Sequence, residues 1–484
     1  MANITETYRT HAKLHYHKIA VQTVKKKISY IEWYELISKT ANWLNSLEVE
    51  NKVLGIHLPN GIAFLQFFTG ASMAGWTAVP IGLKWKENEL FSRITLSNPS
   101  IIISTKEIFT QHHPQLPNLL MLEDCLLQID GMSNEFLEQT KGDLPFYIGF
   151  TSGTTGNPKA FGRSQKSWVA SFECNRYDLQ IDSSDHVLIP GSLIHSHFLY
   201  GAVSTLYLGG TVFLMEKFSS KEMISCIRSN PISTIYTVPT MIEAIVEETV
   251  VEKPLKVLSS GAKWSKESKQ KIRKTFPQLT MYEFYGSSEL SFVTVLSDKD
   301  GIQKSSSVGQ PCYGVELQIR RTNNEMAKVY EPGKIFVRSE LFINGYLDKS
   351  NRISQPFRDG DGWATVHDIG YMDEDGFLYI VGREESMILY GGINIFPEEI
   401  EKIIALHAEV DEVAVVGFPN KYWGQIVAAV VKGRVTSLEL KRLCKIHLAS
   451  YKIPRRWFFL EEIPYTTSGK IARAEILKKL KDGE

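Results

Sequence analysis

One nine-residue segment concentrates the groups that could hold a phosphate. Residues 151–159 read Thr-Ser-Gly-Thr-Thr-Gly-Asn-Pro-Lys and directly follow an apolar stretch at 146–150. Glycine lets the backbone approach a ligand closely, while backbone N–H groups, hydroxyls and an ammonium can hold phosphate oxygens. A polar surface loop could share this composition, but the ordered string after a predicted strand favours a phosphate-binding loop.

Better-known phosphate and nucleophile motifs do not fit this segment. Gly156 is followed by Asn-Pro-Lys rather than by Lys and Ser or Thr, which excludes a Walker A loop. The centre of 149–153 is Thr151 rather than serine, so the segment is not the nucleophile elbow of an α/β-hydrolase. No GxGxxG string opens a predicted helix, and a dinucleotide site is therefore not supported.

The composition limits the class of protein. The 484 residues are 43% hydrophobic and 22% charged, which is typical of a globular chain. Because 54 basic residues balance 54 acidic ones, no global field favours a nucleic acid or an anionic membrane as a partner. Five scattered cysteines without a CxxC pair indicate reduced thiols rather than a disulfide framework or a zinc site.

Two long uncharged stretches raise the question of a membrane span. Residues 61–83 and 195–215 are each long enough to cross a bilayer. Both are interrupted by glycine and by polar residues, which favours a buried helix running into a buried strand. The N-terminal residues have no apolar core that would indicate a secretory signal. We therefore expect a cytoplasmic protein without stable membrane insertion.

Short apolar runs alternate with helical patterns over most of the chain. Runs at 53–58, 100–104 and 233–237 are separated by amphipathic stretches such as 32–47. This alternation predicts mostly parallel sheets covered by helices, and the length exceeds one hydrophobic core. We predict an α/β fold in which residues 1–382 form a large, layered N-terminal region.

The character of the sequence changes near residue 383. Turn-rich segments precede it, and the chain beyond it is a compact mixture of predicted helices and strands. Helices are predicted at 397–406 and 437–450, and strands at 412–418, 425–431 and 456–460. Residues 386–484 are therefore predicted to form a small α+β domain, joined to the large region by residues 383–385.

Further motifs follow the phosphate-binding segment along the chain in a fixed order. They are Ser260-Gly261-Ala262, Tyr285-Gly286-Ser287-Ser288-Glu289, Gly345-Tyr346, Gly362-Trp363 leading to Asp368, Gly382-Arg383, 391–397 and 464–473. This series resembles the adenylate-forming superfamily of acyl-CoA synthetases, carrier-loading adenylation domains and beetle luciferases. The resemblance covers almost the whole chain, and residues 151–159 resemble the signature loop of that family.

The resemblance implies that the chain activates a carboxylic acid with ATP. The acid would form an acyl-adenylate with release of pyrophosphate, and the thiol of CoA would then displace AMP; such transfers depend on charge neutralisation and placement. Glu289 would ligate Mg²⁺, which favours oxygen ligands. The residues that would bind ATP or AMP are Thr151, Ser152, Gly153, Thr154, Thr155, Lys159, Gly261, Ala262, Tyr285, Gly286, Ser287, Ser288, Asp368 and Arg383.

Lys470 is the residue to which the resemblance gives the main catalytic role. Its ammonium would lie between the carboxylate and the α-phosphate and offset the charge that develops there. A solvated lysine in a basic tail is the alternative, but the surrounding frame at 464–469 favours catalysis. The resemblance also implies a hinge at Glu385, about which the small domain rotates, and a pantetheine tunnel along Gly391 and Gly392.

The resemblance places the acid pocket around residues 192–200. His195 would orient the carboxylate or gate the acyl channel and is therefore counted with Lys470 and Glu289 as catalytic. His195 and His197 could alternatively bind a metal, but no Cys or Asp partner is near in the sequence. Amino-acid-activating members carry Asp where this chain has His195, so an aliphatic or aryl acid is the expected substrate.

Five positions depart from the family pattern. Val366-His367-Asp368 replaces Thr-Gly-Asp, and Lys334 replaces the usual glutamate after Gly333. Ala160 replaces a glycine and Gln165 replaces a histidine. None of these changes removes a residue with a named catalytic role, but together they indicate a divergent branch, to which the acids of better-known members do not transfer directly.

Alternatives to an acyl-CoA synthetase stay open. The chain could load an acid onto the phosphopantetheine of an acyl carrier protein, or be a catalytically inactive binding protein on the same fold. The presence of Lys470, Glu289, Asp368 and Arg383 disfavours the inactive protein. A serine acyl-enzyme using Ser260 and Lys263 would need SDN and KTG motifs, which the sequence lacks. The oligomeric state is expected to be a monomer or a homodimer.

Overall fold

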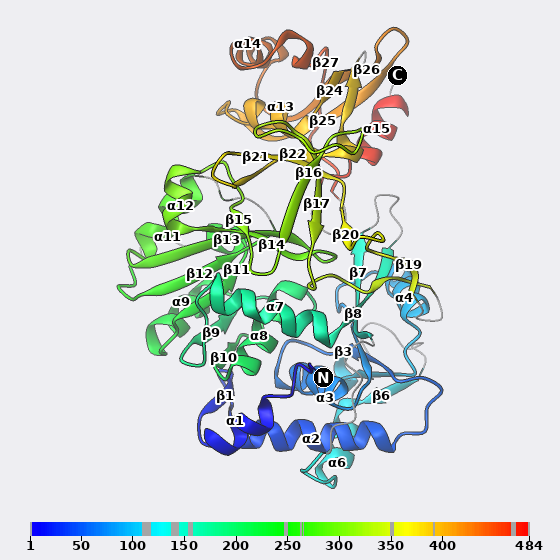
Figure 1. Ribbon diagram of the computed structural model, residues 1–484, viewed down its shortest axis with the longest axis vertical. Coiled ribbons are helices and arrows are strands. Elements are labelled where there is room, and N and C mark those ends of the chain that lie inside the picture. The colour runs from blue at the N-terminus through cyan, green and yellow to red at the C-terminus, as the bar shows by residue number, and fades with distance from the viewer. Residues whose placement is uncertain are drawn as a thin grey trace. The chain divides into compact units, whose positions relative to one another are not determined.

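The computed structural model describes two compact units. The first comprises Met1–Thr151, Pro158–Glu316 and Arg338–Ala364, and the second comprises Leu317–Val337 and Thr365–Glu484. Their elements are labelled in Figure 1. The structure describes residues 2–108, 118–136, 145–152, 158–245, 250–261, 264, 266–348, 353–390, 393–465 and 471–482.

The first unit contains an eight-stranded sheet. Its strand order is β19-β18-β8-β7-β4-β3-β5-β6. Strand β4 pairs in parallel with β7 and with β3, and β3 pairs in parallel with β5, whereas β18 runs antiparallel to β8. The strands are β3 (Val53–His57), β4 (Thr77–Pro80), β5 (Ile101–Ser104), β6 (Leu119–Met121), β7 (Pro145–Ser152), β8 (Pro158–Ser164), β18 (Gly345–Leu347) and β19 (Ile353–Pro356).

The same unit contains a nine-stranded sheet of order β15-β14-β13-β12-β11-β9-β10-β1-β2. The six strands from β13 to β1 in this order are parallel neighbours. The strands are β1 (Ile19–Gln22), β2 (Lys27–Ser29), β9 (His186–Ile189), β10 (Thr211–Leu214), β11 (Thr234–Thr237), β12 (Leu255–Ser259), β13 (Leu279–Ser287), β14 (Ser291–Ser297) and β15 (Gln310–Pro311).

Helices cover these two sheets and fill the space between them. α7 packs on β8 and β14, while α8 packs on β9, β10 and β11, so this pair of helices lies between the sheets (Figure 1). The helices of the unit are α1 (Tyr8–Leu14), α2 (Tyr30–Ser46), α3 (Ile62–Met73), α4 (Glu87–Ser97), α6 (Leu122–Asp130), α7 (Gln165–Tyr177), α8 (Ser196–Leu208), α9 (Ser220–Ser229), α10 (Pro239–Glu243), α11 (Lys266–Thr275) and α12 (Asp298–Gln303).

Aromatic side chains connect the two sheets through the helix layer. The fully buried ring of Trp168 on α7 lies 5.2 Å from Phe146 of β7 and 5.6 Å from Tyr200 of α8, measured between ring centroids. Tyr200 in turn lies 5.2 Å from Phe292 of β14. Because large aromatic side chains bury much apolar surface and restrict each other's orientation, they fix the spacing of the two sheets.

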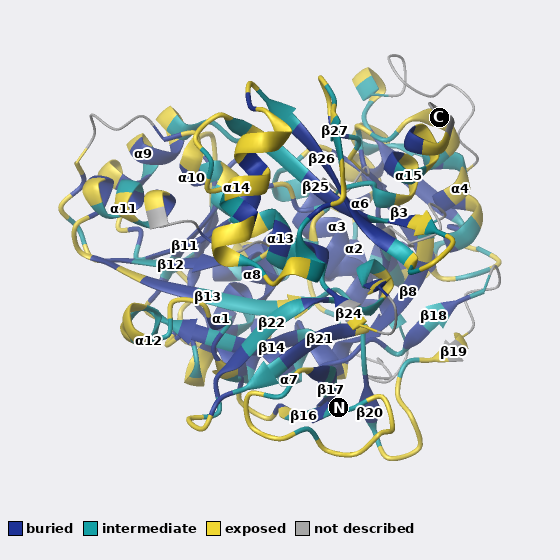
Figure 2. Cartoon of the chain, turned by 90° about the horizontal axis from the view of Figure 1, so that it is seen from above, coloured by how far each residue is buried: buried dark blue, intermediate teal, exposed yellow. Residues whose placement is uncertain are grey.

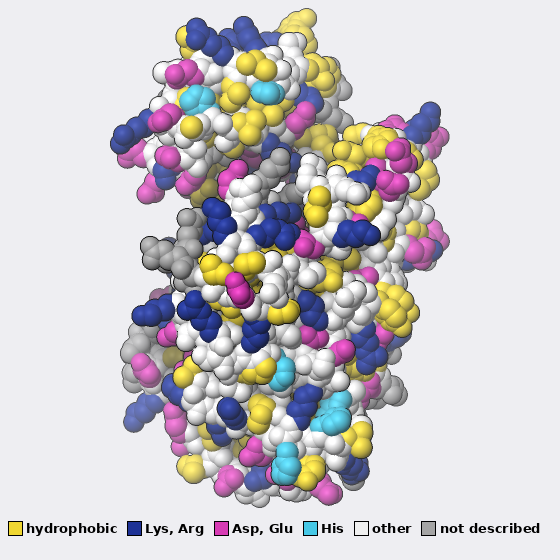
Figure 3. Space-filling view, turned by 90° about the vertical axis from the view of Figure 1, so that its left-hand side faces the viewer, with side chains coloured by type: hydrophobic (Ala, Val, Ile, Leu, Met, Phe, Trp, Pro, Cys, Tyr) yellow, Lys and Arg dark blue, Asp and Glu magenta, His cyan; other side chains and the backbone are white. Residues whose placement is uncertain are grey.

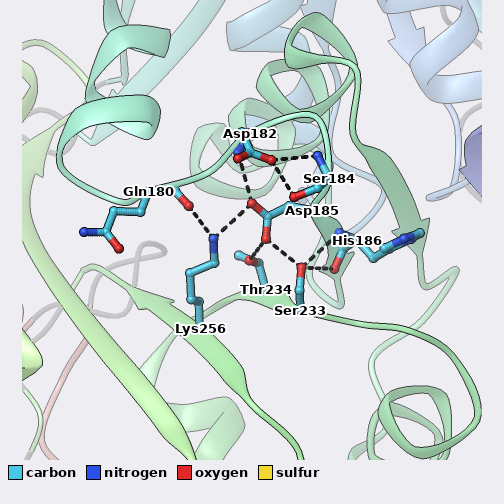
Figure 4. Close-up of polar contacts among 8 residues, drawn as sticks. All are labelled: Gln180, Asp182, Ser184, Asp185, His186, Ser233, Thr234 and Lys256. Carbon is cyan, nitrogen blue, oxygen red and sulfur yellow. Dashed lines mark hydrogen bonds and ion pairs between the residues drawn. The ribbon is translucent and has the colours of Figure 1, made fainter. Parts of the chain in front are cut away.

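A buried carboxylate fixes the amino ends of three parallel strands. Asp185, which precedes β9, accepts hydrogen bonds from Ser233 Oγ at 2.6 Å and Thr234 Oγ1 at 3.0 Å, beside the start of β11 (Figure 4). Its other oxygen pairs with Lys256 Nζ of β12 at 2.9 Å and accepts from the backbone N–H of Asp182. A buried charge is retained only when it is paired and hydrogen-bonded, as here.

The second unit combines a small sheet with an α+β region. The small sheet has the order β16-β17-β21-β22, formed by β16 (Glu316–Arg320), β17 (Gly333–Arg338), β21 (Asp368–Met372) and β22 (Leu378–Arg383). The α+β region contains β23 (Ile388–Tyr390), β24 (Ile393–Ile395), β25 (Val410–Asn420), β26 (Gly424–Gly433) and β27 (Arg456–Phe459), with helices α13 (Pro397–Ile404), α14 (Ser437–His447) and α15 (Arg473–Asp482).

The α+β region has a hydrophobic core of its own. Strands β25 and β26 bury a run of small and β-branched residues against α13, α14 and α15, with Ile400, Leu440 and Ile476 fully enclosed. Helix α14 shows the expected amphipathic pattern, since Leu440 and Cys444 face inward while its outer residues are exposed (Figure 2). A capping box between Thr436 and Glu439 satisfies the first N–H groups of that helix.

The predicted fold class is confirmed. The sheets of the first unit are rich in parallel pairs and covered by helices, and the C-terminal elements form an α+β region. Both uncharged stretches are a helix followed by a strand, α3 then β4 and α8 then β10, and within the described residues no helix is long and apolar enough to span a membrane. The predicted boundary at 383 falls at the end of β22, inside the second unit, and the hinge stays a prediction.

Candidate functional site

The signature segment connects two neighbouring strands of the eight-stranded sheet. Thr151 is half-buried near the end of β7, and Lys159 is exposed at the start of β8. A connection between adjacent strand ends can present backbone N–H groups to a phosphate. Outside the described residues lie Gly153, Thr154 and Thr155, and nothing is described of the Ser152 side chain.

Tyr346 brings the signature lysine and the predicted magnesium ligand together. The ammonium of Lys159 lies 5.1 Å from the centre of the Tyr346 ring. The Tyr346 hydroxyl donates a hydrogen bond of 3.2 Å to Oε1 of Glu289. Burial and the neighbouring Glu289 carboxylate raise the pKa of Tyr346, so its hydroxyl keeps the proton that it donates. The pairing of β18 with β8, in which Tyr346 lies opposite Phe161, makes this arrangement possible.

The surroundings of Glu289 fit a magnesium ion bound together with a nucleotide. Its carboxylate is half-buried, and its backbone carbonyl accepts from the N–H of Ile343 at 3.1 Å, which anchors the turn after β13. In the part of the chain that the structure describes, no three His, Cys, Asp or Glu side chains gather into a metal site. A Mg²⁺ ion at Glu289 would therefore complete its coordination with phosphate oxygens and water, as this ion commonly does.

Tyr285 and the residues that follow it lie where β13 bends. The pairing with β14 shifts register between Tyr285 and Gly286, which is the signature of a bulge. A Cβ atom on Gly286 would lie 1.9 Å from the carbonyl oxygen of Ser291, so only glycine fits the bend. Ser287 Oγ accepts from the N–H of Leu290 at 3.0 Å and closes the turn, in which Ser288 is half-buried.

His197 links the carboxyl ends of two parallel strands. Its Nε2 lies 3.0 Å from the carbonyl oxygen of Thr237, the last residue of β11, and its Nδ1 lies 3.2 Å from Oγ of Ser260, just after β12. Because a carbonyl can only accept, Nε2 carries the proton and Nδ1 accepts from the Ser260 hydroxyl. Burial lowers the pKa of His197 to about 4, which keeps the ring neutral near pH 7.

The contacts of His197 argue against a metal site formed by His195 and His197. Both nitrogens of His197 are engaged by protein groups, so neither is available as a ligand. His195 is the N-cap residue of α8, but its side chain makes no capping hydrogen bond and the residue is exposed. Partial burial of its ring lowers the pKa of His195. The sequence indicated a role for His195 but suggested His197 only as a metal ligand, so the bonds of His197 to Thr237 and Ser260 were not predicted. The place of His197 at the predicted helix start was the available signal.

Gly261 leaves open space beside Ser260. Its φ of +89° lies in the left-handed region that favours glycine, and a Cβ atom there would meet nothing within 4 Å. The backbone is therefore free to approach a ligand at this position. The adjoining Ala262 lies outside the described residues.

In the second unit, Asp368 and Arg383 form a pair across two strands. They are opposite each other where β21 begins and β22 ends, and Arg383 Nε lies 3.1 Å from Asp368 Oδ1. The Asp368 side chain is 8% exposed, whereas that of Arg383 is 43% exposed. Glu385 follows within a short 3₁₀ helix, Glu384–Ser386. Lys470, Gly391 and Gly392 lie outside the described residues.

The family model described as AMP-binding enzyme matches residues 8–347, and the model described as AMP-binding enzyme C-terminal domain matches residues 399–470. The chain therefore belongs to the AMP-binding enzyme family, which confirms the resemblance found in its motifs.

Relatives extend this match over the whole chain. The uncharacterized acyl-CoA ligase YhfT of Bacillus subtilis (strain 168) is 45% identical over 99% of this chain and 98% of its own length. The 2-succinylbenzoate–CoA ligase of Geobacillus sp. (strain WCH70) is 26% identical over 96% of each chain. The o-succinylbenzoate CoA synthetase (MenE) from Bacillus subtilis, solved with the acyl-adenylate intermediate OSB-AMP, superposes with a TM-score of 0.87 at 25% identity over 98% of each chain.

Substitutions can distinguish the hydrogen bonds made by the two ring nitrogens of His197. His197→Asn keeps an acceptor near the position of Nδ1, whereas His197→Gln keeps a donor near that of Nε2. If the bond to Ser260 shapes the acid pocket, His197→Gln and Ser260→Ala should each raise the KM for the acid about fivefold, the effect of losing one hydrogen bond. Steady-state kinetics at fixed, saturating ATP would measure this.

His197→Asn is the matched control and should leave the acid KM within about twofold of the parent value, because the acceptor is retained. Equal acid KM values for His197→Asn and His197→Gln would contradict a role through Ser260. Thermal unfolding of both variants would separate this effect from loss of the fold.

Proposed function

We propose that this chain is an AMP-forming acyl-CoA synthetase. A carboxylate oxygen of the acid would attack the α-phosphate of ATP, giving an acyl-adenylate and pyrophosphate. The thiol of CoA would then attack the acyl carbon, forming a thioester and releasing AMP and a proton. The observation that carries the proposal is the convergence of Lys159 and Glu289 on Tyr346 in a member of the AMP-binding enzyme family.

The described residues are suited to the charges in the first step. Thr151 and Lys159 would contact the phosphates of ATP, and Glu289 would hold the magnesium ion between them. Tyr285 would stack on adenine, and the nearly buried Asp368 would accept hydrogen bonds from the ribose hydroxyls. A solved relative, MenE from Bacillus subtilis, has been determined with ATP and a magnesium ion at 25% identity and a TM-score of 0.87.

The acid would be an aliphatic or aryl carboxylic acid. The proposed pocket segment combines the fully buried Leu193 and Leu199 with the half-buried Ile194. Neutral His195 and His197 offer no negative charge for an α-ammonium. Similarity to enzymes named for 2-succinylbenzoate supports the inclusion of aryl acids.

Delivery of the acyl group to an acyl carrier protein is the second candidate. CoA and a carrier present the same pantetheine thiol, so the tunnel proposed at Gly391 and Gly392 would serve both. The ligase names of YhfT and of the succinylbenzoate enzymes favour CoA.

We place the reaction in the cytoplasm because all five cysteines are free thiols, which a reducing compartment maintains. On the face shown in Figure 3, acidic and basic side chains are interspersed.

Pyrophosphate release from ATP and Mg²⁺ tests the proposed function. The purified chain would be incubated with short, medium and long fatty acids, aryl acids, dicarboxylates and amino acids, with and without CoA. We expect release that depends on one acid class and rises strongly when CoA is added. Acid-dependent release that does not respond to CoA would favour carrier loading, and no release with any acid would overturn the proposal.

Lys470→Ala tests the proposed catalytic lysine. Loss of the ammonium should slow acyl-adenylate formation by about 100-fold or more, since it would stabilise charge in the transition state. Equilibrium binding of ATP should stay within about twofold of the parent value, because the remaining phosphate contacts are unchanged. Lys478→Ala removes an exposed lysine of α15 and is the matched control. Unchanged adenylation in Lys470→Ala would remove the assignment.

Glu385→Pro tests the proposed hinge. Proline fixes φ near −65° and would restrict rotation, so thioester formation should fall about tenfold while adenylation changes little. Glu385→Ala keeps the freedom of the backbone and should behave like the parent enzyme. Single-turnover measurements of each half-reaction would show the difference, and equal losses in both would count against rotation at this residue.

A further inference from the structure

Two departures from the family pattern meet at one carboxylate. Lys334 lies on β17, where the family usually has glutamate, and His367 precedes β21, where the family usually has glycine. Lys334 Nζ and His367 Nδ1 each lie 2.9 Å from Oε2 of Glu384, which follows β22. We refer to Lys334, His367 and Glu384 as the Glu384 cluster. It joins three strands of the small sheet.

The backbone of His367 is adapted to this contact. His367 has a φ of +62°, a left-handed conformation that residues other than glycine rarely adopt. Its carbonyl oxygen accepts from the N–H of Glu384 at 2.9 Å, and its ring reaches the Glu384 carboxylate. The side chain thus makes an interaction that glycine could not make, which compensates for the less favourable backbone.

The charges within the cluster depend on one another. Desolvation acts to raise the pKa of Glu384, but the hydrogen bonds from Lys334 and His367, with the charge of Lys334, lower it overall. The carboxylate therefore stays ionised and paired. A glutamate at 334, as the family usually has, would instead place a second carboxylate against Glu384.

Residues of the Glu384 cluster lie next to the Asp368–Arg383 pair on both strands. His367 precedes Asp368 and Glu384 follows Arg383, and these two residues are themselves register partners. Lys334 lies opposite Ile369, next to Asp368, on the other side of β21. Movement of Glu384 would thus shift the backbone of both members of the pair.

We propose that the Glu384 cluster positions Asp368 and Arg383 for the ribose of ATP. This inference rests on the proposed function, in which that pair holds the ribose. The three residues act through the pair and do not touch the nucleotide. Their contribution is therefore to nucleotide affinity, while the binding of the acid and of CoA is independent of them.

Charge exchange tests this role. Lys334→Glu and Glu384→Lys each break the cluster and should raise the KM for ATP and the Kd for AMP about fivefold, while the KM for the acid and for CoA stays unchanged. The double variant Lys334→Glu/Glu384→Lys restores an opposite pair and should recover most of the loss. Arg321→Glu, which breaks the Arg321–Glu331 pair elsewhere in this unit, is the matched control and should leave both constants at the parent value.

His367→Gly supplies a second, independent variant. It removes the ring from Glu384 and relieves the left-handed backbone, so stability should be retained while AMP binding weakens. Unchanged AMP binding in all three single variants, or no recovery in the double variant, would overturn the proposal. Equilibrium titration measures AMP binding without any acid or CoA, so it tests the Glu384 cluster separately from the proposed reaction. If the chain binds AMP but releases no pyrophosphate with any acid, the proposed reaction is rejected and the role of the cluster can still be tested.

Discussion

The parallel strands of the nine-stranded sheet depend on the buried carboxylate of Asp185. It joins the amino ends of β9, β11 and β12 through Ser233, Thr234 and Lys256. Since these strands are parallel, fixing one end determines where their carboxyl ends lie together, and it is there that His197 bridges Thr237 and Ser260. Ligands of open α/β sheets commonly bind at this edge. A hydrogen-bonded network at the amino ends of the strands thus fixes the position of the carboxyl ends, where we propose that the acid binds.

The two sheets of the first unit meet at the site through Tyr346 and Glu289. Glu289 follows β13 of the nine-stranded sheet, whereas Tyr346 lies on β18 of the eight-stranded sheet. The hydrogen bond from Tyr346 to Glu289 can form only if the two sheets keep a fixed spacing. The buried rings of Trp168, Tyr200 and their neighbours maintain that spacing. The aromatic layer therefore serves the site as well as stability, because a small shift would separate a hydrogen bond of this length.

The fold was predictable where a local pattern determines structure. The uncharged stretch 61–83 became α3 and β4 because a helix buried on all sides carries no charge. The small sheet of β16, β17, β21 and β22 was not predicted, since its strands are separated by turns and do not alternate with helices. Likewise, motif order indicated Glu289 and Asp368, but no sequence period predicts that Tyr346 donates to Glu289 or that His197 contacts Ser260, because such contacts depend on tertiary packing.

The departures from the family pattern show what a sequence comparison leaves out. Taken one at a time, lysine at 334 reverses a charge and histidine at 367 strains the backbone, and each would be expected to weaken the ribose site that we propose at Asp368 and Arg383. In the structure both side chains bind the same carboxylate, that of Glu384. The energetic effect of either residue is then defined only in the presence of its partners, as for any interacting pair. In this chain the residues beside Asp368 and Arg383 depart from the family pattern, while that pair stays in register.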